Sequence, residues 1–510
     1  MTVPSEAGPP VPTAEPHRNA SWAGLVGVIT LALVLTATYI VAQVIAWAAP
    51  EPVSRSAFVK HFLLPEPVPF RVTRILLPIG WGVAALLCLV LLRTRRNGPR
   101  EAQHAAGPLK AGGAPGMRSE QTVQACRLGI LGALLAPFTI MPLSVMVGNV
   151  PQMLFCLPPT LAALLLVHRV QLYRRMPGWL LASGLGWGAL IGGGFGLVMI
   201  TWMQRSVPGY FTSGSWERPL DGVRELYTLF PLHTAVVTEV GKAAGVAVLF
   251  LLFRRHIDGI VSGLVLGAAV ALGYNFMETA YYLNLVNPDH HFTQLWDRQV
   301  VGLFTTHVAF TALAGAGIGA ARWLPSRRDR LLTSGGGLLA AVGGHFETDV
   351  VLMRLDGHRA DWFADEALGL LVGIPAMTVV ATGVFVALCV LILRRGLKAQ
   401  AAGLTDALIT EAASGRGAVT ELEIGLLLSP RRRLLLELRV WRRDGTAGLR
   451  HLVRLQQAQL DLATQQWHRR RAGADSFIPE EEPLRERVLE LKGTPSSPRP
   501  PALPERKALS

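Results

Sequence analysis

The feature that most constrains this chain is a succession of long, uninterrupted apolar runs. A helix that crosses the hydrocarbon core of a bilayer needs about 20 apolar residues. In lipid its backbone groups must be hydrogen-bonded within the segment, which a helix achieves. The sequence therefore predicts an all-α polytopic membrane protein with about ten transmembrane helices. The predicted spans cover residues 22–49, 72–93, 126–149, 152–168, 178–203, 231–253, 257–286, 300–321, 331–353 and 367–393.

The net charge of +14 would favour a nucleic-acid partner in a soluble protein, but the placement of the arginines favours the lipid bilayer instead. Arginines cluster in alternate loops, and the intervening loops are short or carry both signs. This alternation is the positive-inside pattern. It predicts a multi-pass protein of the cell membrane with both termini in the cytoplasm and no nucleic-acid partner. The clusters lie at 93–100, 169–175, 254–255, 322–330 and 394–398.

Composition divides the chain into six parts. The Pro-rich residues at its two ends are predicted to be a disordered N-terminus and a tail. Between them we expect five accessory transmembrane helices with a flexible inner linker, a four-helix core, a last transmembrane helix and a cytoplasmic helical region. From the N-terminus, the bounds are 1–21 for the disordered end, 22–203 for the accessory helices with the linker at 94–121, and 231–353 for the four-helix core. The last transmembrane helix covers 367–393, the cytoplasmic region 398–493 and the tail 494–510.

The cytoplasmic region is predicted to contain a small basic helical hairpin. Ser429 is a good N-cap and Pro430 suits the first turn, whereas Asp444-Gly445 should end that helix. A second helix then runs to about Arg471. Two interpretations stay open for this hairpin, a solvated charge-rich surface or a surface that contacts lipid headgroups.

Four consecutive predicted spans, those at 231–253, 257–286, 300–321 and 331–353, carry ionisable residues. Such residues are costly within a membrane, and they usually face the protein interior and have a partner. Each of the four spans places one of them seven or eight residues from its outer end, roughly 12 Å deep at 1.5 Å per residue. Helices of opposite direction share this depth, which predicts one common site. Its members are Glu239, Glu278, His307 and His345, supported by Lys242 next to Glu239 and by Asp349 one turn after His345.

Small residues in the second of these spans support the convergence. Gly259, Gly263 and Gly267 repeat every four residues along one face, and Glu278 falls on that same face. Glycines at this spacing allow helix backbones to approach each other closely.

Two carboxylates and two imidazoles are suited to the activation of water. One interpretation is that the paired carboxylates share this work, one as base and one as acid. The alternative is a divalent metal such as zinc, held by Glu278, His307 and His345, whose bound water attacks a carbonyl. No cofactor other than such a metal is indicated, and the sequence leaves the two interpretations open.

Residues 230–353 resemble the PrsW family of intramembrane proteases, within the superfamily that includes the CAAX-prenyl endopeptidases. The family's Glu-Glu-x-x-Lys motif is similar to residues 238–242, and its Phe-x-x-x-Glu-Asn motif is similar to 274–279. An Asp-Gly-Ile-Val segment matches 258–261. An arginine followed by a histidine matches Arg298 and His307, and the last motif matches His345 and Asp349.

The resemblance implies a hydrolase of peptide bonds that depends on glutamate and histidine, with Arg298 as a supporting residue. It also implies a membrane-anchored protein substrate, similar to an anti-sigma factor, that is cut near the extracytoplasmic surface. This chain departs from the motifs at Thr238, where the family has its first glutamate, and at Thr279, where it has asparagine. Two alternatives therefore stay open: a catalytically impaired binding or immunity protein of the same family, and a proton-coupled transporter.

Overall fold

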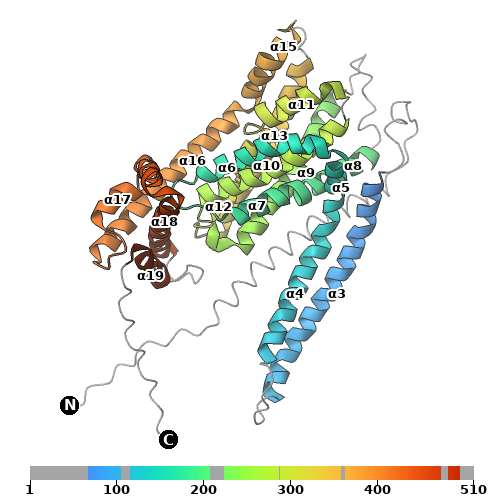
Figure 1. Cartoon of the computed structure of the whole chain (residues 1–510). Helices are drawn as coiled ribbons and strands as arrows, with labels where there is room; N and C mark the ends of the chain where they lie inside the picture. The colour runs from blue at the N-terminus through green and yellow to red at the C-terminus, as the bar shows by residue number, and fades with distance from the viewer. Residues whose placement is uncertain are drawn as a thin grey trace, which may run out of the picture. The chain divides into compact units, whose positions relative to one another are not determined.

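The computed structural model describes residues 67–104, 115–206, 223–285, 288–357, 362–363, 365–472 and 481–493. Every regular element in these ranges is a helix. The predicted span at 22–49, the predicted disordered residues 1–21 and the tail 494–510 lie outside the described residues. The bounds, shown in Figure 1, are α3 Val68–His104, α4 Pro115–Leu135, η1 Ala136–Thr139, α5 Ile140–Gly148, α6 Val150–Arg169, α7 Gly178–Gly186, η2 Trp187–Gly192, α8 Gly193–Ser206, α9 Val223–Leu252, η3 Arg254–His256, α10 Ile260–Leu285, η4 Pro288–His290, α11 His291–Trp296, η5 Asp297–Val301, α12 His307–Ala321, α13 Arg327–Gly357, α15 Glu366–Leu368, η6 Gly369–Gly373, α16 Ile374–Ala413, α17 Glu421–Leu427, α18 Pro430–Ala472 and α19 Glu481–Lys492.

Within the described ranges, seven helical segments are long and apolar enough to cross a membrane. They correspond to the predicted spans from 72–93 to 257–286 and to the last one, 367–393. Helix α12 is shorter, and α13 covers the predicted span at 331–353 without reaching the same apolar character. The all-α, multi-pass class is thereby confirmed, whereas the count of ten stays a prediction.

Two elements differ from the prediction. The flexible linker expected at 94–121 is helical on both sides, since α3 continues to His104 and α4 begins at Pro115. The Arg, Ala, Gln and Glu residues in this segment are good helix formers.

The second difference concerns the predicted span at 300–321, which is broken beside the candidate site. A π-helical turn ends at Val301, residues 302–306 form turns, and α12 begins at His307. The Thr305 hydroxyl donates to the carbonyl oxygen of Val301 at 3.1 Å, and the Thr306 hydroxyl donates to that of Gly302 at 2.8 Å. Such side-chain bonds compete with the helical ladder. His307 is therefore the first residue of a helix and not, as predicted, a residue one-third along it.

The chain forms two compact units, and each is described by itself. The larger consists of residues up to 168 and from 176 to 392. Its centre is α10, whose side chains from Val261 to Asn275 are all buried. Helices α9, α12 and α7 with η2 pack around it (Figure 1). A helix that is buried on every side is apolar on every side. Helix α10 follows this rule except toward its C-terminal end, where Glu278 lies.

Close backbone packing joins α10 to α12. A methyl group on Gly263 would overlap the carbonyl oxygen of Gly315, and one on Gly267 would overlap that of Thr311. A methyl group on Gly315 would likewise overlap the carbonyl oxygen of Gly263, and one on Gly319 would overlap that of Gly259, just before α10. The stripe of small residues predicted from 259 to 267 therefore contacts α12, which sets the distance between Glu278 and His307.

The smaller unit comprises residues 169–175 and 393–510. Helix α18 begins at Pro430, as predicted, and Gly445 has φ 67° and interrupts it where the sequence predicts a break. The unit also contains α17 and α19, and α16 reaches into it as far as Ala413. It is thus larger than the predicted hairpin. Val488 of α19 and Leu462 of α18 share one apolar cluster with Ala418 and Ala458.

The glycine contact between α10 and α12 yields a first prediction. Gly263→Ala should lower the free energy of unfolding by about 1–3 kcal/mol, because the added methyl group forces the two backbones apart. Gly335→Ala on α13 is the matched control, since no atom lies within 4 Å of the added carbon and alanine favours the helix. Denaturation of both variants in detergent measures the difference. Equal stability of the two would contradict the packing argument.

Candidate active site

The first half of the site is centred on Glu239 of α9, whose side chain is fully buried. One carboxylate oxygen pairs with the ammonium of Lys242, one turn further along the helix, and lies 3.0 Å from Nδ1 of His345. The other oxygen accepts a hydrogen bond of 2.9 Å from Thr311 of α12. Three helices thus converge on one carboxylate. A buried charge is tolerated only when it is paired and hydrogen-bonded, and here both conditions are met.

The second half is centred on Glu278 of α10. One of its carboxylate oxygens lies 2.7 Å from Nη1 of Arg298 and 2.7 Å from Nε2 of His307. The other accepts a hydrogen bond of 3.1 Å from the hydroxyl of Tyr274, one turn earlier on the same helix. Arg298 also lies over the ring of Tyr282 at 3.6 Å. Each of the two carboxylates therefore has its own cation.

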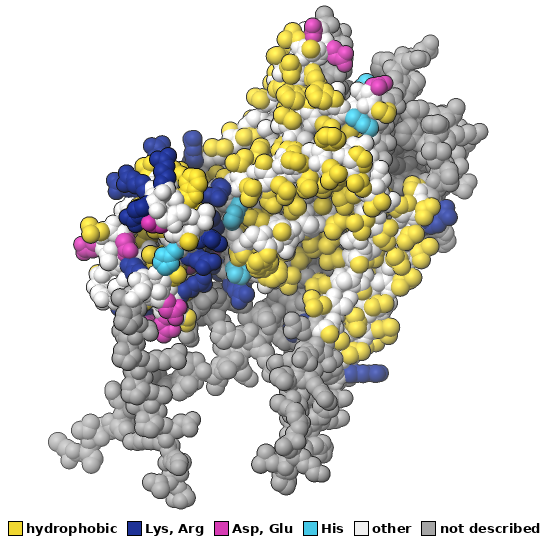
Figure 2. All heavy atoms as spheres, viewed as in Figure 1, with side chains coloured by type: hydrophobic (Ala, Val, Ile, Leu, Met, Phe, Trp, Pro, Cys, Tyr) yellow, Lys and Arg dark blue, Asp and Glu magenta, His cyan; other side chains and the backbone are white. Residues whose placement is uncertain are grey.

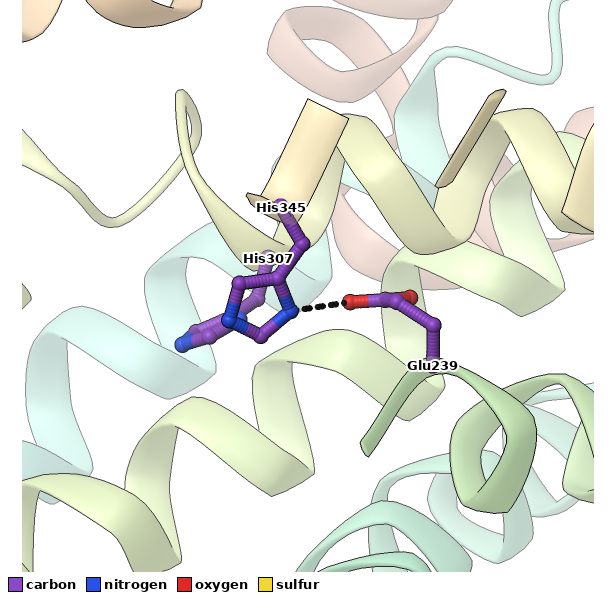
Figure 3. Close-up of side chains that lie close together, drawn as sticks. All are labelled: Glu239, His307 and His345. Atoms are coloured by element: carbon purple, nitrogen blue, oxygen red, sulfur yellow. Dashed lines mark hydrogen bonds and ion pairs between the residues drawn. The ribbon is translucent and has the colours of Figure 1, made fainter. Parts of the chain in front are cut away.

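The two halves are joined through His307. Its Nδ1 lies 3.2 Å from the Lys242 ammonium, while its Nε2 contacts Glu278. The rings of His307 and His345 pack edge to face with centroids 5.0 Å apart. Figure 3 shows the His345 ring turned toward Glu239, with His307 beside it. The structure thus brings together all four residues that the depth argument selected.

The supporting residues also lie here. Asp349 is 3.5 Å from Nε2 of His345, and Lys242 and Arg298 neutralise the two glutamates. Thr238, which stands at the first glutamate of the family motif, is fully buried with its hydroxyl 3.2 Å from Nδ1 of His345. The departure from the motif therefore falls inside the site.

The donor atoms suit a divalent metal, although not through the predicted set. The compact group consists of Glu239, His307 and His345, with one ligand atom of each within 4.8 Å of the others. Two imidazoles and a carboxylate form a common zinc ligand set. Glu278, which the sequence placed in this set, instead holds His307 by a hydrogen bond. The Lys242 ammonium contacts Glu239 and His307, so a metal ion held by this group would compete with the ammonium for the same two side chains.

Sequence reasoning gave no role to two residues of the network, Tyr274 and Thr311. Tyr274 lies with its ring 5.0 Å from that of His307 and 4.4 Å from the Lys242 ammonium. A signal was present for both. Tyr274 precedes Glu278 by four residues and Thr311 follows His307 by four, the spacing of neighbours on one helical face.

Residues 176–380 match the family model of the PrsW family intramembrane metalloproteases. The match covers less than half of the chain, and over this segment the chain is similar to the PrsW family. No curated protein and no solved structure matches the chain. The matched segment runs from α7 into α16 and contains every residue of the network. The PrsW resemblance drawn from the motifs is confirmed, and with it a multi-pass membrane protein of a peptide-hydrolase family.

The hydrogen bond of Tyr274 to Glu278 gives a second prediction. Tyr274→Phe keeps the ring against His307 but removes a donor to a buried carboxylate, and such bonds contribute about 1.5–3 kcal/mol. The variant should lose a similar amount of its free energy of unfolding. Tyr281→Phe, on the same helix and in ring contact with Tyr282 instead of hydrogen-bonded to Glu278, is the control. A Tyr274→Phe protein as stable as the Tyr281→Phe protein would show that this bond contributes little.

The donor set gives a third prediction. If the PrsW segment holds a metal, purified protein should retain about one divalent ion per chain, because a structural or catalytic site of this kind binds tightly. His345→Ala should lose that ion, whereas His290→Ala should keep it, since His290 is exposed. Elemental analysis after dialysis measures both. Equal metal content in the two variants would remove His345 from the ligand set.

Proposed function

We propose that this chain is an intramembrane endopeptidase that cuts a membrane-anchored protein near the extracytoplasmic surface. The observation that supports it most is the continuous network of Glu239, Lys242, His307, Glu278 and His345, buried in helices of the PrsW segment. A helix bundle with a purely structural role does not require buried charges, because apolar residues would pack there without the free-energy cost of desolvating them.

The network provides the groups that peptide hydrolysis requires. A carboxylate removes a proton from water, the oxygen of that water adds to the carbonyl carbon, and the proton passes to the leaving amine. Glu239 and Glu278 serve as the proton-handling groups, and His307 and His345 orient the water and stabilise the oxyanion. A divalent metal such as zinc held by Glu239, His307 and His345 would polarise the carbonyl and acidify the water.

The break before α12 supports this assignment. His307 opens the helix, and the first amide groups of a helix have no carbonyl partner within it. The N-terminal end of a helix carries partial positive charge, which stabilises a nearby anion. An oxyanion that forms beside His307 would therefore meet both the imidazole and this helix end.

The substrate and the sidedness are part of the proposal. The depth of Glu239, Glu278 and His345, counted from the predicted outer ends of their spans, favours a cut close to the outer surface, and His307 contacts Glu278 at this level. The resemblance supports a membrane-anchored, anti-sigma-factor-like protein as substrate. Both termini of this chain are then cytoplasmic, as the alternation of arginine clusters favours.

One alternative has an observation in its favour. Thr238 replaces a glutamate inside the site, and Lys242 occupies two of the three donors of the metal group. A protein with this arrangement would bind membrane proteins of the same class without cutting them.

The fourth prediction separates these two functions. Glu239→Gln and Glu278→Gln preserve the shape of each side chain and remove its charge, so each should abolish nearly all cleavage. The double variant should lose little more, because the residues act as a unit. Glu347→Gln is the control, as Glu347 is exposed on the same helix as His345. Membrane-protein fragments, compared by N-terminal sequencing in cells that express each variant, provide the measurement.

Thr238→Glu complements this experiment, because it restores the glutamate pair of the motif. It should leave cleavage unchanged or raise it. If the wild type and both glutamine variants give the same fragments while Thr238→Glu adds new ones, the natural protein is a binding protein. If no variant changes the fragments and all remain folded, the peptidase proposal is wrong.

A further inference from the structure

The first half of α18, Pro430–Asp444, has one face anchored within the smaller unit. Arg433 is buried, its guanidinium donates to the carbonyl oxygen of Leu172 and it lies 5.9 Å from the Tyr173 ring. Leu427, just before the helix, belongs to the apolar cluster that also contains Tyr173 and Leu460. These contacts fix which side of the helix points outward.

The outward side combines apolar and basic residues, and the one acidic residue between 431 and 443, Glu437, is half-buried at its edge. Leu434, Leu438 and Trp441 follow one another at intervals of four and three residues, and they are 54%, 39% and 49% exposed. That spacing places them on one face. Leu435 is 55% exposed beside them. The remaining exposed residues of this stretch are arginines, namely Arg431, Arg432, Arg439, Arg442 and Arg443.

The arginines of this face have few acidic partners. Only Arg443 has an acidic neighbour on it, Asp444, with which it makes two hydrogen bonds of 3.0 Å. Figure 2 shows dark blue side chains gathered over the region of α17–α19, with hydrophobic side chains between them.

We propose that residues 430–444 form an interfacial helix that lies in the headgroup region of a bilayer containing anionic phospholipids. A helix with exposed leucine and tryptophan on one face and arginine around it inserts its apolar face some 5–10 Å into this region. The arginines are attracted to the negative surface of the leaflet. This role is independent of the proposed peptidase activity.

The smaller unit is joined directly to a predicted transmembrane helix. Helix α16 runs without interruption from its apolar part through Arg394, Arg395 and Lys398 to Ala413 in the smaller unit. Basic residues at this position mark where a transmembrane helix leaves the hydrocarbon. A second copy of the same face is disfavoured as the occupant, because each copy would present five arginines to the other.

An environment-sensitive fluorophore on the full-length protein tests the proposal. In a variant with Cys88, Cys126, Cys156 and Cys389 replaced by alanine, Leu438→Cys carries the probe. Leu422→Cys is the matched control, since Leu422 is 94% exposed on α17 between Glu421 and Glu423. Each protein is reconstituted into vesicles of phosphatidylcholine alone and of an equal mixture with phosphatidylglycerol.

We expect a several-fold rise in emission with a blue shift for the probe at 438 in the mixed vesicles only, and no change at 422. Salt at about 1 M, where the Debye length is about 3 Å, should reduce the rise, as should Arg431→Gln combined with Arg442→Gln. If the cysteine-free protein fails to fold, the tryptophan fluorescence of the natural protein and of Trp441→Phe is measured in vesicles with brominated phosphatidylglycerol. The difference in quenching between the two proteins then reports whether Trp441 lies in the lipid.

Three results would overturn the proposal. A probe at 438 that reports water in both kinds of vesicle would mean that the face stays solvated. An equal shift in both would mean that anionic lipid plays no part. A shift that grows with protein density, and appears in detergent as well, would identify a second copy as the occupant.

Discussion

The buried charges of the larger unit constrain the rest of its structure. A carboxylate in a membrane helix is tolerated only with a cation and donors within reach. Glu239 and Glu278 meet this condition separately, one with Lys242 and the other with Arg298. The two ion pairs need α9, α10, α12 and the segment before α12 to lie at short, fixed distances. The glycine contacts between α10 and α12 provide this, because they let two backbones touch where larger residues would hold them apart.

Much of this arrangement follows from the sequence because helix geometry is regular. A rise of about 1.5 Å per residue converts residue counts into depths, so the convergence of Glu239, Glu278, His307 and His345 could be inferred without coordinates. Depth says nothing about rotation around each helix axis. For that reason the sequence predicted Glu278 as the carboxylate ligand of a metal beside the two histidines, whereas in the structure Glu239 is the carboxylate that lies in one compact group with both histidines. The tertiary packing of α9 against α13 decides this, and no local pattern records it.

The break at 302–306 was missed for a related reason. Val300, Val301 and Leu303 continue the apolar run, and hydrophobic periodicity cannot distinguish a helix from a short turn within such a run. The hydroxyls of Thr305 and Thr306, bonded to carbonyl groups one turn back, hold the turn. Irregular backbone at membrane depth is tolerated where protein surrounds it, and Gly302 and Leu303 are buried. Departures from regular structure of this kind are concentrated at functional sites.

Lys242 connects the departure at Thr238 with the chemistry. A second glutamate, at position 238, would add a negative charge close to His345. It would also give the Lys242 ammonium, four residues further along the helix, a second carboxylate partner. With threonine there, Glu239 is the only carboxylate within hydrogen-bond reach of Lys242 among the described residues, and the ammonium lies between Glu239 and His307. A metal ion bound by Glu239, His307 and His345 would have to displace the Lys242 ammonium. The buried ammonium would then lose its contacts with Glu239 and His307. A metal ion and the Lys242 ammonium would therefore exclude each other at this site, and a glutamate at 238 would add negative charge beside it.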